Sequence, residues 1–232
     1  MNLLAIDTSS LACSVALRVG DVVIERHEEQ AREHTRLLTP MIREVLTESG
    51  MLLPHLDAIV LGNGPGSFIG MRIAASVAQG LAHGAGLSIV PVSSLAAVAG
   101  EVLEDAAIDE VVVAQDAHMS EVYLGGFRRG PGGIPVPLFP ERLHTQTMIE
   151  ELEPGTADRR VAAGFGWLRY PGLAAANEDL IGQLSAVLHP RARFLIPLGA
   201  AAWRAGGAIQ PGDLVPAYLR SKVAAKPSVG KT

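Results

Sequence analysis

The chain has 232 residues, of which 48% are hydrophobic and 19% are charged, and its formal net charge is −5. This composition supports a folded core, excludes a disordered protein, and argues against a stand-alone nucleic-acid binder, which would show a basic face. A single cysteine, no signal-peptide pattern and no apolar run near the ~18 residues of a membrane span predict a soluble, cytoplasmic protein without disulfides.

The N-terminal segment predicts three strands and a helix. The strands are predicted from short apolar runs at Leu3–Ile6, Cys13–Val19 and Val22–Arg26. A helix is predicted over Arg32–Ser49, where apolar residues recur on one side, and Gly50 ends it. This order indicates a strand meander followed by a helix, as in an α/β protein.

A glycine-rich loop, Gly64–Arg72, follows a predicted strand at Ala58–Leu61 and leads into a predicted helix at Phe68–His83. It lacks the Gly-Lys-Ser/Thr ending of a Walker loop and the third glycine of a dinucleotide fingerprint. Glycines admit a close partner, an N-cap serine begins the helix, and a helix N-terminus attracts anions. The candidate cofactor-binding residues of the loop are therefore Gly64, Gly66 and Ser67. A glycine-rich turn without any ligand remains the alternative interpretation.

A second segment resembles the start of the chain. Val111–Asp116 is an apolar run that ends on an aspartate, and a polar turn and a second strand at Glu121–Leu124 follow it. A shift of 109 residues superposes Asp7 on Asp116. The repeat predicts two related α/β lobes.

The remaining elements are predicted from local composition. We predict a strand at Ser88–Pro91, a helix over Ser93–Glu104 and a helix at Phe194–Trp203. Gly130–Pro140, with four prolines and three glycines, is predicted to be an irregular excursion, and Ser221–Thr232 a loose tail.

These elements predict a division into two lobes. Residues 1–106 form the first lobe, completed by 205–220, and residues 107–204 form the second. Three scattered arginine pairs are predicted to be solvated surface rather than an RNA-binding track: Arg128-Arg129, Arg159-Arg160 and Arg191/Arg193.

Several short motifs occur together, in order, along nearly the whole chain: Ile6-Asp7-Thr8-Ser9, Ser14–Leu17, His34 with Leu37-Leu38, Gly64–Arg72, Asp116-Ala117, Glu121–Tyr123, and Pro216 with Tyr218–Arg220. In this order they resemble the bacterial TsaB (YeaZ) family of tRNA threonylcarbamoyladenosine biosynthesis proteins, within the actin/sugar-kinase/Hsp70-like superfamily. The resemblance implies an α/β fold of two related, ribonuclease H-like lobes, with mixed sheets flanked by helices. Ile69, His118 and Ser120 depart from the threonine, arginine and glycine usual in the family.

The resemblance implies a role rather than a reaction. Family members are non-catalytic scaffolds for a larger paralogue, TsaD, which transfers a threonylcarbamoyl group to N6 of an adenosine in certain tRNAs. A small ATPase, TsaE, joins them. The expected partners are therefore TsaD as a heterodimer, TsaE, and a second copy when the chain is alone, with tRNA contacted only through the complex and no membrane.

The resemblance also implies no catalytic or metal residue. The His-x-x-x-His pair of TsaD has no counterpart in Val90–Val98, and none of the seven histidines stand three or four positions apart. In the superfamily a hairpin after the first strand wraps phosphates, and Asp7, Thr8 and Ser9 occupy it here without its glycine. Asp7 either holds a hydrated cation or stabilises the turn. We expect no cofactor on the isolated chain, with ATP or ADP held at the junction with TsaD.

The Phe68–His83 helix has its polar residues on one narrow stripe, so its own lobe or another chain must cover it on more than one side. The resemblance implies pairing through this helix and the preceding one. The candidate interface residues are Leu38, Met41, Ile42, Val45, Met71, Ala74, Ala75 and Ala78. The competing hypothesis is a stand-alone ATP-dependent phosphotransferase or hydrolase of the same fold. A metal-dependent peptidase is disfavoured by the missing histidine pair.

Overall fold

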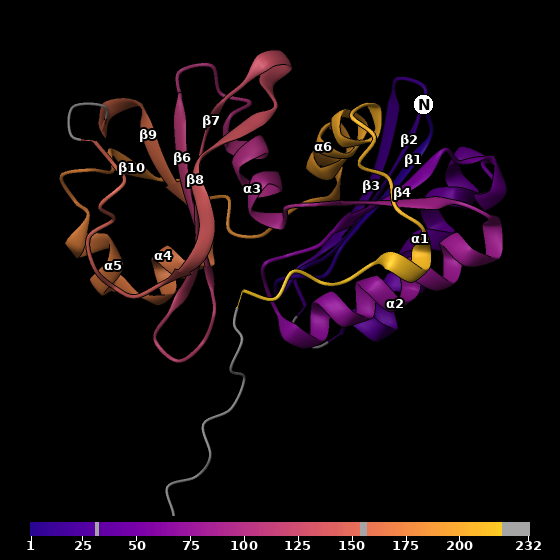
Figure 1. Cartoon of the computed structure of the whole chain (residues 1–232), viewed down its shortest axis with the longest axis horizontal. Helices are drawn as coiled ribbons and strands as arrows, with labels where there is room; N and C mark the ends of the chain where they lie inside the picture. The colour runs from indigo at the N-terminus through magenta and orange to yellow at the C-terminus, as the bar shows by residue number, and fades with distance from the viewer. Residues whose placement is uncertain (31–32, 154–156, 220–232) are drawn as a thin grey trace, which may run out of the picture.

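The structure, a computed structural model, describes residues 1–30, 33–153 and 157–219. In this part of the chain two five-stranded mixed sheets lie side by side, each flanked by helices (Figure 1). The first sheet has the order β3-β2-β1-β4-β5, and its strands are β1 (Leu3–Asp7), β2 (Cys13–Val19), β3 (Val22–Glu28), β4 (Ala58–Gly62) and β5 (Ser88–Val92). The second has the order β10-β9-β6-β7-β8, with β6 (Glu110–Asp116), β7 (Val122–Arg129), β8 (Pro135–His144), β9 (Arg160–Ala163) and β10 (Gln183–Leu184).

The two sheets follow one plan, which confirms the prediction of two related α/β lobes. In the first, β1 pairs antiparallel with β2 and parallel with β4. In the second, β6 pairs antiparallel with β7 and parallel with β9. The central strands β1 and β6 end on Asp7 and Asp116, the two residues that the 109-residue shift superposes. The two aspartates therefore lie at equivalent ends of equivalent strands.

Among the described residues, α-helices flank both sheets, and none of them is long and apolar enough to cross a bilayer. They are α1 (His34–Ser49), α2 (Phe68–Ala85), α3 (Ser94–Val102), α4 (Phe165–Arg169), α5 (Pro171–Ala176) and α6 (Ala192–Arg204). Their predicted caps are present: the hydroxyl of Ser67 accepts the amide of Gly70 at the start of α2, and Gly50 ends α1 with a φ of 66°. Glycine suits this left-handed conformation because it has no Cβ. Arg32, the predicted start of α1, lies outside the described residues.

Helices cover both faces of the first sheet, so its central strands β1 and β4 are fully buried. On one face α1 and α2 pack against side chains such as Leu4 and Ile59; on the other, α6 packs against Leu3 and Val60. Gly199 of α6 lies where a Cβ would overlap the Val60 side chain, so a glycine allows α6 to approach the sheet closely.

The lobes exchange one helix each. Helix α3 follows β5 in the chain but packs on the second sheet, against Val111, Val113 and Phe127. Helix α6 follows β10 but packs on the first sheet, and the two helices contact each other between the sheets (Figure 1). The predicted boundary between residues 106 and 107 follows chain order, whereas the packing assigns α3 and α6 across it.

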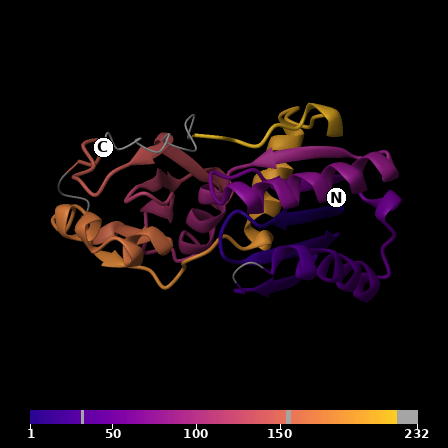
Figure 2. The same cartoon turned by 90° about the horizontal axis from the view of Figure 1, so that it is seen from below.

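The described C-terminal segment, residues 205–219, returns to the first lobe. Ile209 exchanges backbone hydrogen bonds of 3.0 and 2.8 Å with Ile89 at the edge of the sheet, and Leu214 joins the core beneath α2. Figure 2 shows this yellow segment running across the first lobe toward the second. The predicted tail Ser221–Thr232 lies outside the described residues.

Part of Gly130–Pro140 is regular, contrary to the prediction of an irregular excursion. Strand β8 begins at Pro135 and continues beyond Pro140 to His144. Among the described residues it is an edge strand, with β7 as its one neighbour, so prolines are tolerated where their missing amide would face away from the sheet.

The prediction that the arginine pairs are solvated surface is wrong for three of their members. Arg160 is buried: its guanidinium pairs with Glu110 at 2.6 Å and donates to the carbonyls of Glu153 and Leu180. Arg129 donates to three backbone carbonyls after α3, and Arg191 pairs with Glu25 on β3. These arginines fasten elements of the fold, since each satisfies buried or half-buried acceptors.

Candidate functional site

The glycine loop packs directly on the turn that follows β1. The Ser67 amide donates to the Ser9 carbonyl at 2.6 Å, and the Thr8 hydroxyl donates to the Gly70 carbonyl at 2.7 Å. A Cβ at Gly66 would overlap the Ser9 carbonyl, and a Cβ at Gly70 would overlap that of Thr8. The glycines therefore admit the protein's own backbone where a phosphate-binding loop would admit its ligand.

Asp7, at the end of β1, is buried and has hydrogen-bond partners on both carboxylate oxygens. Oδ1 accepts the Ser9 amide at 2.8 Å and the Ser9 hydroxyl at 2.7 Å, while Oδ2 accepts the Ser94 hydroxyl at 2.6 Å. A Cβ at Gly62 would overlap Oδ2, so the strand beside it also closes on this carboxylate. Burial raises the pKa of Asp7 to about 6, although its hydrogen bonds lower it. These contacts are those of a turn-stabilising aspartate.

Asp116 is the counterpart of Asp7 in the second lobe. Its Oδ1 accepts the His118 amide at 2.8 Å and the Tyr170 hydroxyl at 2.8 Å, and its Oδ2 lies 3.3 Å from Nδ1 of His118. The turn that it begins is strained: His118, Met119 and Ser120 have φ values of 60°, 54° and 61°. Left-handed backbone costs a non-glycine residue roughly 1–2 kcal/mol. Strain of this kind clusters at functional sites.

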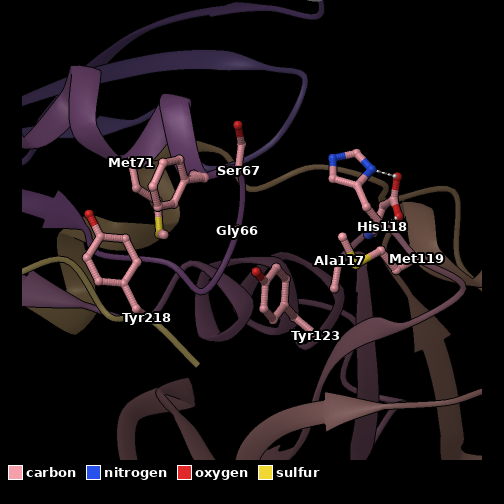
Figure 3. Close-up of a pocket in the computed structure, with 10 residues that line it drawn as sticks. Gly66, Ser67, Met71, Ala117, His118, Met119, Tyr123 and Tyr218 are labelled. Atoms are coloured by element: carbon pink, nitrogen blue, oxygen red, sulfur yellow. Dashed lines mark hydrogen bonds and ion pairs between the residues drawn. The ribbon is translucent and has the colours of Figure 1, made fainter. Parts of the chain in front are cut away.

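The glycine loop and the turn after β6 line a pocket between the lobes. Its walls come from the glycine loop, the start of α2, the turn after β6, the start of β7 and the C-terminal segment (Figure 3). The lining residues are Gly66, Ser67, Phe68, Met71, Asp116, Ala117, His118, Met119, Tyr123 and Tyr218. The structure brings three sequence candidates to this pocket, Gly66, Ser67 and Met71. Asp7, Thr8, Ser9 and Gly64 lie behind its wall.

Sequence reasoning missed the aromatic character of the pocket. Two of the chain's three tyrosines, Tyr123 and Tyr218, line it together with Phe68. Because the chain has so few aromatic residues, its tyrosines could have been singled out as candidate binding residues. The sequence could not show that Tyr123 and Tyr218 line the same pocket, because they lie far apart in it.

The eight candidate interface residues are buried in their own lobe, which corrects their assignment to a partner surface. Those of α1 and Ala74, Ala75 and Ala78 of α2 form the core beneath the two helices, and none is more than 5% exposed. Met71 faces the pocket. The helical period explains the error: a face that buries alanine against a sheet has the same pattern as one that buries it against another chain. The outward side of α2 carries Ile69, Arg72 and Ser76.

The described residues contain no group of three or more His, Cys, Asp or Glu side chains placed to hold a metal ion. Cys13 is buried on β2, and burial raises the pKa of its thiol to about 12, so it is an unreactive thiol at neutral pH. His34, the first residue of α1, is buried with Nε2 3.2 Å from the Ala12 carbonyl.

Comparison with known proteins agrees with this geometry. The TsaD family, described as tRNA N6-adenosine threonylcarbamoyltransferase, matches residues 21–134. The chain is 36% identical to the tRNA threonylcarbamoyladenosine biosynthesis protein TsaB of Escherichia coli over all of both chains. It is also 36% identical to the protein of the same name from Haemophilus influenzae, covering all of this chain and 98% of that one.

Solved structures point to the same family. YeaZ from Pseudomonas aeruginosa superposes with a TM-score of 0.83 at 34% identity, over 94% of this chain and 99% of that one. A second structure from that organism, an uncharacterized protein described as similar to peptidase YEAZ, has the same TM-score at 35% identity. The chain is 36% identical to a TsaB protein over its full length, and its two-lobed fold superposes on that of YeaZ. It therefore belongs to the TsaB (YeaZ) family.

Proposed function

We propose that this protein takes part in tRNA threonylcarbamoyladenosine biosynthesis as a non-catalytic subunit that pairs with the paralogue TsaD. The pathway is that of the relatives named TsaB, which this chain matches over its full length. One observation supports the non-catalytic part of the proposal. The site where a phosphate-binding loop would receive its ligand is filled by the Ser9–Ser67 and Thr8–Gly70 hydrogen bonds.

The packing of the glycine loop on the turn after β1 leaves few free polar groups for a nucleotide to bind. Backbone amides and a carboxylate would ordinarily hold phosphate and its cation there. In this chain the Ser67 amide already donates to a carbonyl, and Asp7 is surrounded by Ser9 and Ser94. ATP or ADP is therefore held at the junction with TsaD, where the paralogue supplies groups that this chain lacks.

The outward sides of α1 and α2 are the surface through which we propose that the chain pairs. Both helices lie on the same face of the first sheet, and their inward sides are occupied by its core (Figure 1). On α2, Ile69 is 70% exposed and Ser76 and Gly80 are exposed. Small residues allow a second helix to come close. The same surface serves a homodimer when the chain is alone, and TsaE joins the TsaD complex.

Reconstitution tests the proposal. Threonylcarbamoylation of tRNA is measured with purified TsaD, TsaE and the threonylcarbamoyl donor, with and without this protein. We expect turnover to require the protein and to saturate as it titrates TsaD. Full activity in its absence would overturn the proposal. Steady hydrolysis of magnesium ATP by the isolated chain would instead favour the stand-alone phosphotransferase or hydrolase.

A further inference from the structure

The pocket between the lobes has walls suited to a flat ring. Tyr218, in the C-terminal segment, and Tyr123, at the start of β7, both line it, together with the Gly66 backbone (Figure 3). Two thioethers, Met71 and Met119, add polarisable apolar surface. Aromatic faces and methionine sulfur both favour contact with a planar, π-rich group.

The apolar groups at the rim are left open to water. Phe68 is 42% exposed, Tyr218 41% and Met119 65%. Phe68 and Tyr218 lie with their ring centroids 5.7 Å apart, and the Arg72 guanidinium lies 3.2 Å from the centre of the Phe68 ring. Covering exposed apolar surface is favourable, so burial of these side chains by an entering ring stabilises the bound state.

The wall formed by the turn after β6 is set in place before anything binds. Its three left-handed residues are fixed by the Asp116 carboxylate, which accepts the His118 amide, and by the Glu121 amide, which donates to the His118 carbonyl at 3.0 Å. A wall strained into shape in advance lowers the ordering cost of binding. The strained backbone of this turn therefore favours binding, because the wall needs no ordering when a ligand enters.

The polar groups favour a ring nitrogen over a phosphate. The Ser67 hydroxyl accepts the Gly70 amide at 3.2 Å, and among the described residues its own proton has no acceptor. It can donate to a ring nitrogen at the pocket wall. Phosphate finds no open cradle, because the Ser67 amide donates to Ser9 and the Arg72 guanidinium lies over Phe68.

We propose that this pocket binds a nucleobase-like nitrogen heterocycle against its tyrosine side chains, without engaging phosphates. The same chemistry is offered by a free nucleoside and by an unstacked base of single-stranded RNA, since bases of either source stack on aromatic side chains. The inference concerns the isolated chain and does not rest on pairing with TsaD.

Fluorescence of 2-aminopurine, which changes when the base stacks, tests the proposal on the full chain. One arm uses the 2-aminopurine riboside, and the other a single-stranded RNA with one 2-aminopurine. Saturable quenching in either arm supports base binding and identifies the source. Adenosine should displace the probe as well as ATP does, with or without magnesium. Absence of quenching in both arms at millimolar concentration, or ATP binding more than tenfold tighter than adenosine, would overturn it.

Substitutions locate the site. Tyr218→Ala and Met119→Ala change exposed side chains, so they leave the fold intact, and each should weaken probe binding roughly tenfold or more. Leu184→Ala is the matched control, because Leu184 is a similarly exposed apolar residue on β10, at the far side of the second lobe. Thermal unfolding verifies that all three variants are folded. Equal binding by Tyr218→Ala, Met119→Ala and Leu184→Ala would show that the probe binds elsewhere.

Discussion

Asp7 and Asp116 make the same hydrogen bond in the two lobes: each carboxylate Oδ1 accepts, at 2.8 Å, the amide two residues later in the chain. The shared turn is what the 109-residue repeat preserves. Around it the lobes have diverged. Asp7 is enclosed by Ser9, Ser94 and Gly62 of β4, whereas Asp116 lines the pocket and contacts His118 and Tyr170. The turn after β1 is packed against the rest of its lobe, whereas the turn after β6 forms a wall of the pocket.

The buried Asp7 carboxylate should make stability depend on pH. Its pKa in the folded chain is about 6, above the ordinary value of 3.8, so the folded state binds its proton more tightly than the unfolded state does. The free energy of unfolding therefore falls as pH rises from about 4 to 6, by up to about 3 kcal/mol from this group. Urea unfolding of the wild type and Asp7→Asn across this window measures it.

The difference between the two curves isolates Asp7 from other groups. Burial raises the pKa of Glu141 in the same direction, and burial lowers the pKa of His189, which acts oppositely. Both contributions cancel when the Asp7→Asn curve is subtracted. Asp21→Asn, at an exposed carboxylate, controls for net charge. Parallel curves for the wild type and Asp7→Asn would contradict the prediction.

Because the start of α2 packs on the turn after β1, alanine substitutions at two glycines of α2 should have opposite effects on the free energy of unfolding. In Gly70→Ala the new Cβ would overlap the Thr8 carbonyl, so we expect a loss of about 1–3 kcal/mol in the free energy of unfolding. In Gly80→Ala nothing lies within 4 Å of the new Cβ, and alanine is the better helix former, so we expect a gain of up to about 1 kcal/mol. Urea unfolding measures both. Equal effects would show that α2 does not press on the turn after β1.

Neighbouring arginines offer a second matched pair. Arg160→Ala removes the guanidinium that pairs with the half-buried Glu110 and donates to two backbone carbonyls, so the free energy of unfolding should fall by about 3–5 kcal/mol. Arg159 pairs with Asp109 at the surface, and Arg159→Ala should cost about 0–1 kcal/mol. Chemical unfolding separates the two. Similar losses would mean that the burial of Arg160 has little energetic weight.

Local signals predicted most elements of the first lobe. Ser67 begins α2 and Gly50 ends α1 because a cap is set by residues next to it in the chain. Gly130–Pro140 was mispredicted because composition alone does not show that β8 is an edge strand. The segment between Glu141 and His189 carried no predicted element, and its described residues include β9, β10 and the short α-helices α4 and α5.

The site was less predictable, since it depends on contacts between distant segments. The sequence marked Gly66 and Gly70 as places of close approach, and they are, but their partner is the backbone of Thr8 and Ser9. No residue near Arg160 in the sequence predicts that it pairs with Glu110 on the neighbouring strand. The exchange of α3 and α6 between lobes likewise has no local signal, because it is decided by which sheet each helix covers.

The outward side of α2 provides a test of pairing that leaves the fold intact. Ser76 is exposed, so Ser76→Glu should change the free energy of unfolding by no more than about 0.5 kcal/mol. If α2 pairs with TsaD, a glutamate there buries a charge in the interface, and retention of TsaD in a pull-down should fall at least tenfold. Ala74→Glu would place the charge in the core of its own lobe and test folding instead. Leu168→Glu, at an exposed position of α4, is the control. If Ser76→Glu retains TsaD as well as Leu168→Glu does, the pairing surface lies elsewhere.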